Sequence, residues 1–309
     1  MLYRLRQSVA YRYFQFRTRG LEATRPLTSD SSSRCEVHTM LGTSDVTMYI
    51  LAIKSLLSYI PGLAVAVHSD GSLTDDDLDH IRQHVRGIRF ILHHDADARA
   101  AERLRNSPFL AKWRAVDAAY RRLIDIELWR HSEQIIILDA DVLANEVPHE
   151  VSEWIRSGTR PFLLGQPSNH PPAQQDTTVP EHVQALFLRN IDEISQRLDT
   201  QPLFVQGATA GFCGYFRELS LPRVEAALKV ALARRMPMDQ WGGDQCLIIY
   251  LLSTAGAERL PPGRYVNFEP SVRNAAKHAS IIHFYGTHRF HGLVYPDLAS
   301  ATVRRLRRS

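Results

Sequence analysis

Residues 134–143 read Gln-Ile-Ile-Ile-Leu-Asp-Ala-Asp-Val-Leu, and this stretch decides the fold. The four aliphatic residues from Ile135 to Leu138 are typical of a strand that is buried on both faces of a sheet. Asp139 and Asp141 follow at the carboxyl end of that strand, where open α/β sheets bind their ligands. Two carboxylates this close together need a neighbouring cation, or one of them must take up a proton. The pattern favours a hard divalent ion that holds a phosphorylated substrate.

Predicted strands and helices alternate on both sides of this stretch. That alternation indicates an α/β fold with a mostly parallel central sheet and helices on both faces. The expected elements are strands at 35–41, 63–68, 88–92, 134–138 and 162–165, and helices at 46–59, after the cap residue Thr74, and at 108–130, 222–235 and 244–254. Residues 168–178 are polar and contain two prolines, which predicts a loop.

Length and charge divide the chain into three parts. The 309 residues are 44% hydrophobic, which is enough for a large core. We expect a basic and aromatic N-terminal segment with a linker at 1–33, a single globular domain at 34–298, and a basic C-terminal tail at 299–309. The net charge is only +4, and the excess of basic over acidic residues is concentrated at the two ends. Solvated ends are the favoured interpretation, peripheral membrane contact through the basic N-terminus stays open, and no nucleic-acid partner is expected.

Two further patterns concern the cellular compartment. The longest apolar stretch, 48–67, is interrupted by Lys54 and by Pro61-Gly62, so no membrane span is predicted. The N-terminus lacks the apolar core of a signal peptide. Three cysteines without metal-ligand spacing favour a reducing compartment, and we expect a cytoplasmic protein, either free or peripheral to the membrane.

The tripeptide Asp-Ala-Asp occurs twice, and the two copies have different contexts. The copy at 95–97 follows two histidines and precedes alanines and arginines, which is typical of the start of a helix or of a loop. The copy at 139–141 follows a buried strand. Asp-x-Asp alone is a weak signal, and a solvated strand end is its simplest explanation. The context of the second copy favours metal and nucleotide binding.

Residues 281–289 read Ile-Ile-His-Phe-Tyr-Gly-Thr-His-Arg, a second apolar strand that ends in a polar cluster. A neutral histidine such as His283 at a strand end is a good ligand for a divalent ion of the transition type. Gly286 allows backbone amides to approach a phosphate. Arg289 supplies a bidentate phosphate donor. A lone His283 is more often structural, and the glycine and arginine behind it favour a site.

Together these motifs resemble those of glycosyltransferases with the GT-A fold. A hydrophobic strand followed by Asp-x-Asp, with a late His-x-x-Gly-x-x-basic motif, is most similar to glycosyltransferase family 8, the glycogenin-like and bacterial galactosyltransferase group. In this sequence the basic residue is Arg289, followed by Phe290-His291 where the family has Pro-Trp. The resemblance covers most of residues 34–295 as separated motifs. It implies a nucleotide-binding half at about 34–145 and an acceptor half at about 146–298.

The resemblance also implies roles for residues at the donor site. Asp139 would face the donor ribose and the metal, Asp141 and His283 would complete the metal ligands, and Arg289 would hold the diphosphate. Lys112 lies where related enzymes carry a basic residue near the nucleotide or sugar, although a surface lysine is an equally good explanation.

Three weaker expectations concern the nucleobase and the sugar. Arg114 is a weaker candidate than Lys112 for the basic residue, and the turn at 41–43 would lie near the nucleobase. The segment at 206–212, with Gly207 and other small residues, would line the sugar pocket or simply form a glycine-rich bend.

Asp244 and Gln245 open the helix at 244–254, and each has two explanations. A helix N-cap accounts fully for Asp244. By resemblance, the pair lies beside the sugar and the acceptor. In an inverting enzyme Asp244 would be the general base. In a retaining enzyme Asp244 would orient the sugar, and Gln245 would sit near the reacting carbon.

The activity that follows is metal-dependent sugar transfer by a hexosyltransferase. The expected cofactor is Mn²⁺ or Mg²⁺, and the expected donor is a nucleoside diphosphate sugar, with a UDP-sugar favoured by resemblance. The acceptor is a hydroxyl compound, whether glycan, lipid or small molecule. The alternatives are a nucleotidyltransferase, a phosphohydrolase with an aspartate nucleophile, and a non-catalytic membrane-associated protein.

Overall fold

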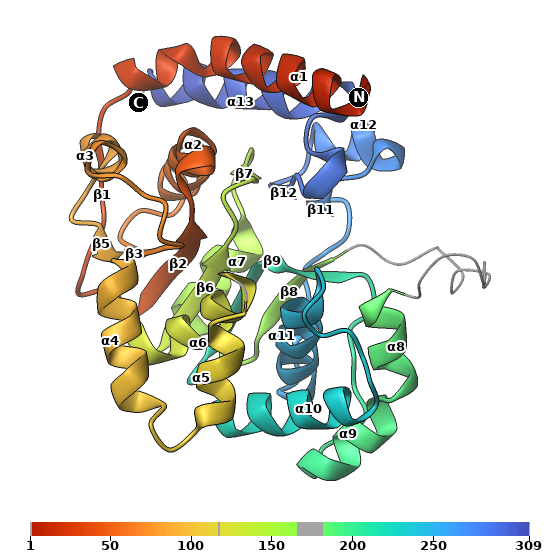
Figure 1. Ribbon diagram of the computed structural model, residues 1–309. Helices are drawn as coiled ribbons and strands as arrows, with labels where there is room; N and C mark the ends of the chain where they lie inside the picture. The colour runs from red at the N-terminus through yellow and green to blue at the C-terminus, as the bar shows by residue number, and fades with distance from the viewer. Residues whose placement is uncertain (1, 117, 166–181, 309) are drawn as a thin grey trace.

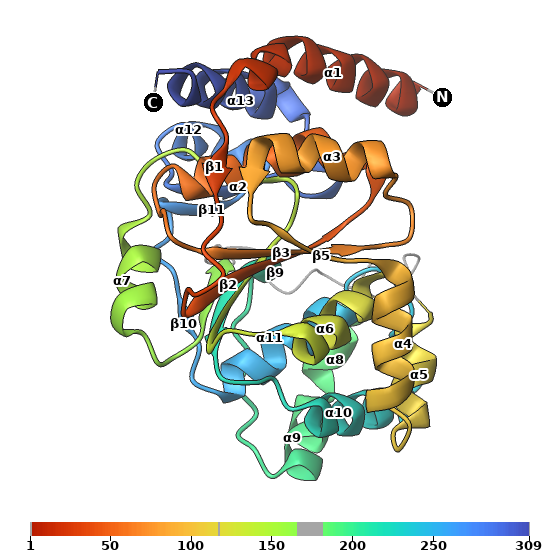
Figure 2. The same ribbon diagram turned by 90° about the vertical axis from the view of Figure 1, so that its left-hand side faces the viewer.

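The computed structural model describes residues 2–116, 118–165 and 182–308, with side chains from residue 8 onward. The loop expected at 168–178 lies outside these ranges. Within them a central sheet of seven strands lies between helical layers (Figures 1 and 2). The strands are β1 (Leu27–Thr28), β2 (Cys35–Leu41), β3 (Ala64–Ser69), β4 (Val85–Arg86), β5 (Arg89–Ile91), β6 (Gln134–Leu138), β7 (Val142–Ala144), β8 (Phe162–Gly165), β9 (Ala208–Phe216), β10 (Glu258–Arg259), β11 (Tyr265–Asn267) and β12 (Ile281–His283).

The order of strands in the central sheet is β10-β8-β9-β6-β2-β3-β5. Four of its six strand pairs are parallel, and β9 runs antiparallel to both β6 and β8. The α/β class and the mostly parallel sheet are therefore confirmed. A smaller sheet, β11-β12-β7, lies beyond the carboxyl end of β6, and β1 pairs with β4.

The strand β6 is buried on both faces, as its sequence predicts. Ile136 and Leu138 belong to one hydrophobic core, and Ile135 and Ile137 belong to the other. Each of the four side chains is at most 1% exposed. Because alternate side chains of a strand point to opposite faces, an unbroken aliphatic run supplies both cores at once.

The helices cover both faces of this sheet and form an additional layer above it (Figure 2). The α-helices are α1 (Leu2–Thr18), α2 (Val46–Leu57), α3 (Asp75–His84), α4 (His93–Arg103), α5 (Pro108–Arg114), α6 (Ala118–Trp129), α7 (His149–Ser157), α8 (Val183–Arg189), α9 (Ile191–Leu198), α10 (Leu221–Ala233), α11 (Gly243–Thr254), α12 (Arg273–Ala276) and α13 (Val294–Leu306). Short 3-10 turns are η1 (Arg19–Ala23), η2 (Thr43–Asp45), η3 (Pro270–Val272), η4 (Gly286–His288) and η5 (His291–Leu293).

The single helix expected at 108–130 is wrong, because two helices, α5 and α6, occupy this region. Arg114 donates to both carboxylate oxygens of Asp125, at 2.5 and 2.9 Å. In a continuous helix, residues eleven positions apart would be separated by roughly 16 Å along the axis. The buried ion pair therefore requires the chain to turn between them.

In the basic segment expected at 299–309, the residues up to Leu306 belong to α13. Ala299, Val303 and Leu306 are buried. The helix α1 lies along α13 at the top of the molecule (Figure 1), and Phe14 stacks on Tyr295 with ring centroids 5.0 Å apart. Tyr11 and Phe14 of the N-terminal segment thus pack on Phe290 and Tyr295 near the other end of the chain. None of the helices in the described ranges has both the length and the apolar character that crossing a bilayer requires.

Candidate active site

A tight turn after β6 positions the two aspartates. The Asp139 N–H donates to the Gly211 carbonyl of β9 at 2.8 Å, which keeps Asp139 in the sheet. The Val142 N–H then donates to the Asp139 carbonyl at 3.1 Å, so the chain reverses within three residues and enters β7. The Asp141 side chain, 7% exposed, is buried inside this turn, whereas that of Asp139 is 32% exposed.

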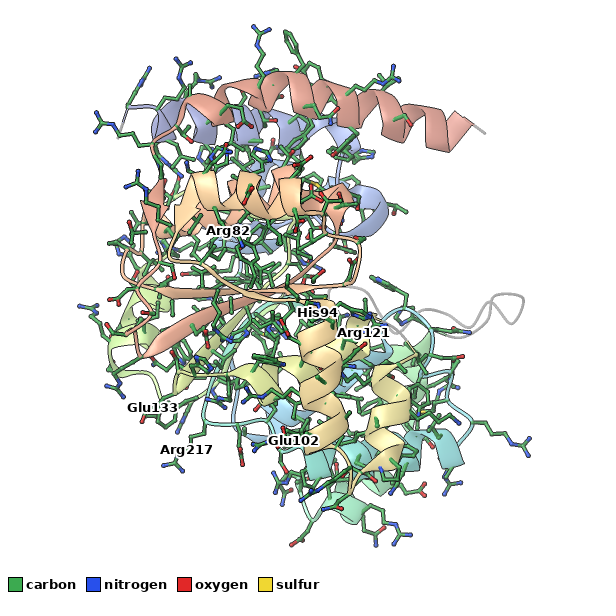
Figure 3. The ribbon with its side chains drawn as sticks, turned by 60° about the vertical axis from the view of Figure 1, so that its left-hand side comes forward. Arg82, His94, Glu102, Arg121, Glu133 and Arg217 are labelled. Carbon is green, nitrogen blue, oxygen red and sulfur yellow. The ribbon has the colours of Figure 1, made fainter. Side chains whose placement is uncertain are left out.

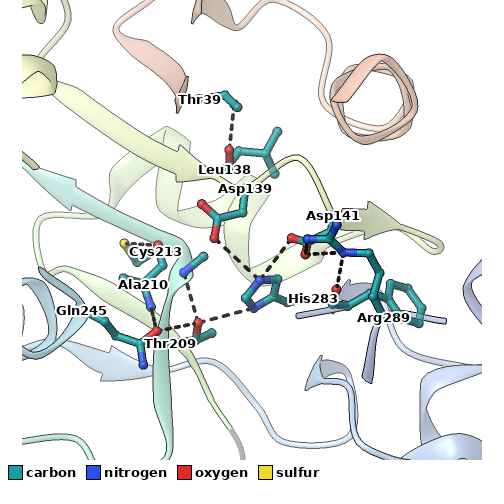
Figure 4. A network of polar contacts seen from close by, with 12 residues as sticks. Thr39, Leu138, Asp139, Asp141, Thr209, Ala210, Cys213, Gln245, His283 and Arg289 are labelled. Carbon is teal, nitrogen blue, oxygen red and sulfur yellow. Dashed lines mark hydrogen bonds and ion pairs between the residues drawn. The ribbon is translucent and has the colours of Figure 1, made fainter. Parts of the chain in front are cut away.

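His283 reaches the aspartates through strand pairing. The strand β12 runs antiparallel to β7, and its register places His283 opposite Val142. The His283 Nε2 atom lies 3.2 Å from Asp141 Oδ1 and 3.7 Å from Asp139 Oδ2 (Figure 4). One ligand atom from each of these residues lies within 4.8 Å of the other two. The structure therefore brings together the three side chains that the sequence proposes as metal ligands.

The hydrogen bonds at His283 Nδ1, on the side of the ring away from the aspartates, determine which tautomer the neutral ring adopts. The Gln245 Oε1 atom accepts from the Ala210 N–H at 3.3 Å and from the Thr209 hydroxyl at 3.2 Å. Since the hydroxyl has one proton to donate, Thr209 Oγ1 accepts from His283 Nδ1, 3.3 Å away. In the neutral ring the lone pair is then on Nε2 and points at the carboxylates. Such a partner behind a histidine is a common feature of metal sites.

Gly211 provides the space in which these groups meet. A Cβ atom at this position would lie 2.4 Å from His283 Cε1 and 2.8 Å from Asp139 Oδ2. Neither distance is compatible with van der Waals contact. The antiparallel strand β9 thus crosses the end of β6 with a residue that lacks a side chain.

Arg289 contacts the carboxylate oxygen of Asp141 that His283 does not contact. Its Nη2 atom donates to Asp141 Oδ2 at 2.7 Å, and its Nη1 atom lies 3.7 Å from Asp45 Oδ1. Burial raises the pKa of Asp141. When the His283 ring is protonated instead of binding a metal, its charge and hydrogen bond, together with those of Arg289, outweigh burial and hold the pKa below its ordinary value. Arg289 therefore lies beside the metal-ligand group, in contact with two acids.

Arg122 is a central residue of the site that the sequence analysis did not identify. From α6 it donates to Asp139 Oδ1 at 2.6 Å and to Asp244 Oδ2 at 2.5 Å. Burial alone would lower its pKa, but the charges of Asp139 and Asp244 raise it above the ordinary value. The resemblance indicates a basic residue in the region that precedes β6. Lys112, which was selected there, is exposed on α5 and is absent from the described residues that line the cavity.

Arg114, the weaker candidate, is held in its ion pairs with Asp125 and Asp97 and is also absent from the described cavity lining. One sequence feature could have indicated Arg122. It directly precedes the apolar pair Leu123-Ile124, which marks the face of the helix that packs on the sheet.

These residues open into a cavity of about 1030 Å³. This volume lies at the upper end of the range for small-molecule sites. Among the described residues, its wall includes Gly207, Gly286, Asp244 and Gln245 as expected. Residues 41–43, the turn expected near the nucleobase, are not among the described lining residues, but the nearby Met40 and Asp45 are.

Comparisons with known proteins identify no family for this chain. No protein-family model matches this chain, and no curated protein matches it. Among solved structures it is similar to the galactosyltransferase LgtC in complex with donor and acceptor sugar analogs, with 14% identity and a TM-score of 0.47, over 86% of this chain and 95% of that one.

Two other glycosyltransferases show a comparable likeness. One is GlyE of Streptococcus pneumoniae TIGR4, with 12% identity and a TM-score of 0.48, over 89% of this chain and 63% of that one. The other is the bifunctional WbbM, with 13% identity and a TM-score of 0.49, over 92% of this chain and 53% of that one. At these identities the likeness concerns the course of the backbone, and the site residues are judged by their own geometry.

Proposed function

We propose that this protein is a glycosyltransferase that moves a sugar from a nucleoside diphosphate sugar, preferably a UDP-sugar, to a hydroxyl acceptor. The observation that carries the proposal is the convergence of Asp139, Asp141 and the Nε2 lone pair of His283 at the wall of a ligand-sized cavity. The motifs that resemble glycosyltransferase family 8 supply the reaction type.

The three converging residues are suited to hold a divalent ion. Two carboxylates and an imidazole lone pair repel one another unless a cation or a proton lies between them. Oxygen ligands suit Mg²⁺ and Mn²⁺, and the imidazole favours Mn²⁺. When bound, such an ion supplies Lewis-acid stabilisation of the negative charge on the leaving diphosphate.

The remaining residues of the site bind and orient the donor. Arg289 adds positive charge beside Asp141, where the diphosphate would lie. Gly286 has a φ of 52° and lines the cavity, so it lets the backbone turn close to a phosphate. The site therefore provides both charge and close approach for an anionic group.

Asp244 is suited to orient the sugar. Its carboxylate already accepts a charge-assisted hydrogen bond from Arg122, which holds the side chain in one position at the cavity wall. This engagement favours the role that Asp244 would have in a retaining enzyme over that of a general base. Gln245 is anchored by Thr209 and Ala210 and lines the same cavity beside it.

The test is nucleotide release from a panel of nucleotide sugars, with and without Mn²⁺. We expect slow release of UDP from one UDP-sugar, because water can replace the acceptor. A chelator should abolish the release, and added Mn²⁺ should restore it. Release of UMP or of inorganic pyrophosphate would instead support a phosphohydrolase or a nucleotidyltransferase. If no nucleotide sugar is cleaved and none raises the melting temperature in the presence of Mn²⁺, the proposal is wrong.

A further inference from the structure

A second group of potential metal ligands lies where the segment after α1 meets α3. None of its residues lines the cavity described above. Glu22 belongs to η1, and His80 and His84 belong to α3. The Glu22 carboxylate lies 3.0 Å from His80 Nε2 and 3.2 Å from His84 Nε2. Both imidazoles thus present the same ring nitrogen to one carboxylate.

The helix α3 places the two histidines side by side. Residues four positions apart lie on one face of a helix, and the two imidazole centroids are 5.2 Å apart. The start of α3 is fixed by a capping box between Thr74 and Asp77, and its inner face by the buried Ile81. Figure 2 shows α3 lying beneath α1, whose end leads into η1. The position of the pair is therefore set by the fold.

The spacing and burial of the group suit a zinc ion. A tetrahedral ion with bonds of about 2.1 Å holds its ligand atoms roughly 3.4 Å apart. One ligand atom from each of the three residues lies within 4.8 Å of the other two. The side chains of His84, His80 and Glu22 are 3%, 31% and 59% exposed, so one end of the group is closed and the other faces solvent. This leaves room for a water molecule as the fourth ligand.

We propose that Glu22, His80 and His84 form a Zn²⁺ site that fastens the N-terminal segment to α3. Two imidazoles and one carboxylate are an established ligand set for zinc. Because Glu22 follows α1 directly, an ion at this site would tie the layer formed by α1 and α13 to the sheet domain. The site has no part in sugar transfer.

Lys54 limits the strength of this site. Its Nζ atom lies 3.4 Å from His84 Nδ1 and donates to Thr24 Oγ1 and to the Arg25 carbonyl. A lysine behind one ligand opposes a second cation by Coulomb repulsion. Zinc must also displace protons from the imidazoles. We therefore expect weaker binding than in closed four-ligand sites, with protons released to the buffer.

The test is zinc titration of the full chain after treatment with a chelator, followed by calorimetry in two buffers. The Asp141→Asn background removes a ligand of the cavity group. In that background we expect one zinc ion per chain. Adding His80→Gln should lower its affinity at least tenfold, whereas His94→Gln is the matched control and should leave it unchanged. His94 is a helix histidine with a 75% exposed side chain, paired with Asp95.

A second comparison avoids any dependence on the Asp141 variant. In the otherwise unchanged chain, Glu22→Gln and His80→Gln should each lower the zinc stoichiometry by one and abolish the rise in melting temperature that this ion contributes. Their nucleotide-sugar cleavage with Mn²⁺ should stay unchanged. The proposal is overturned if the Asp141→Asn protein binds no zinc, or if His80→Gln and Glu22→Gln leave zinc stoichiometry and affinity unchanged.

Discussion

The chain contains the tripeptide Asp-Ala-Asp twice, and the two copies occupy opposite kinds of environment. At 95–97 it lies near the start of α4, where Figure 3 labels His94, and both carboxylate side chains are about half exposed, at 51% and 50%. At 139–141 it follows β6, and the second carboxylate is 7% exposed. The first copy begins a helix, as the sequence predicts, and the second lies at the wall of the cavity.

The partners of the two copies explain the difference. Asp97 pairs with Arg114 at 2.7 Å and lies 3.4 Å from His93 Nε2, so its partners are close to it in the sequence. Asp141 instead contacts His283 and Arg289, which lie more than a hundred residues later in the chain. Of the two copies, only the second lies at the wall of the cavity among the described residues, beside a histidine from a distant strand.

Replacing one acid in each copy should give the largest difference. Asp141→Asn keeps the side-chain volume but removes a negative charge from the ligand group. We expect UDP release to fall by about 10³-fold, because charge stabilisation in the transition state is lost. Asp97→Asn should change the rate less than twofold. Equal activity of the two variants, measured as UDP release with Mn²⁺, would exclude the proposed metal ligands.

Replacing the arginine behind each copy sharpens the comparison. Arg122→Gln breaks buried ion pairs with Asp139 and Asp244, and Arg114→Gln breaks those with Asp125 and Asp97. Each should lower the free energy of unfolding by about 3 kcal/mol, since a buried charge loses its partner. Only Arg122→Gln should also lower UDP release, by about 10²-fold. Denaturant unfolding and initial rates on the same samples measure both effects.

The pH dependence of the free energy of unfolding should differ between the variants of the two copies, by less than the effects above. The pKa of Asp141 and the pKa of Asp97 are both lowered, because their cationic partners outweigh the opposing effect of burial. A carboxyl with a lowered pKa stabilises the fold above its ordinary pKa, near 3.8, and loses this contribution as the pH falls through the lowered value. The fall in the free energy of unfolding below pH 4 should therefore be shallower in the variants.

The change in this pH dependence should be larger for the variant of the more buried carboxylate. Without metal and with a chelator present, Asp141→Asn should flatten the fall more than Asp97→Asn, because water screens the half-exposed Asp97. Denaturant titrations between about pH 2.5 and pH 5 measure these slopes around the ordinary carboxyl range. Identical slopes for the two variants would show that burial of Asp141 does not change its acid response.

Much of the fold was predictable because it depends on local patterns. The bounds of β2 and β6 are as predicted, and Thr74 caps α3. These features need only a run of apolar residues or a cap residue. The break between α5 and α6 was not predictable, because it depends on a buried ion pair between residues on two helices. The packing of α13 depends likewise on α1, at the opposite end of the chain.

The site was predictable where a motif carried it and not where tertiary contacts did. Asp139 and Asp141 follow the apolar strand β6, at the edge where open α/β sheets bind ligands, and His283 ends the apolar strand β12, which pairs with β7. Arg122 follows no such rule, since a charged residue on an amphipathic helix is usually on its solvated face. Thr209 acts through His283, and nothing in its own sequence neighbourhood shows that contact.

Position 211 has a consequence for how activity can be lost in this protein. The three converging side chains fit only because β9 contributes a hydrogen atom there, where any larger group would overlap two of them. A single methyl group at Gly211 should thus silence the enzyme while every polar residue of the site remains. Natural variants at this position would be inactive for reasons of volume, and a survey restricted to charged residues would pass over them.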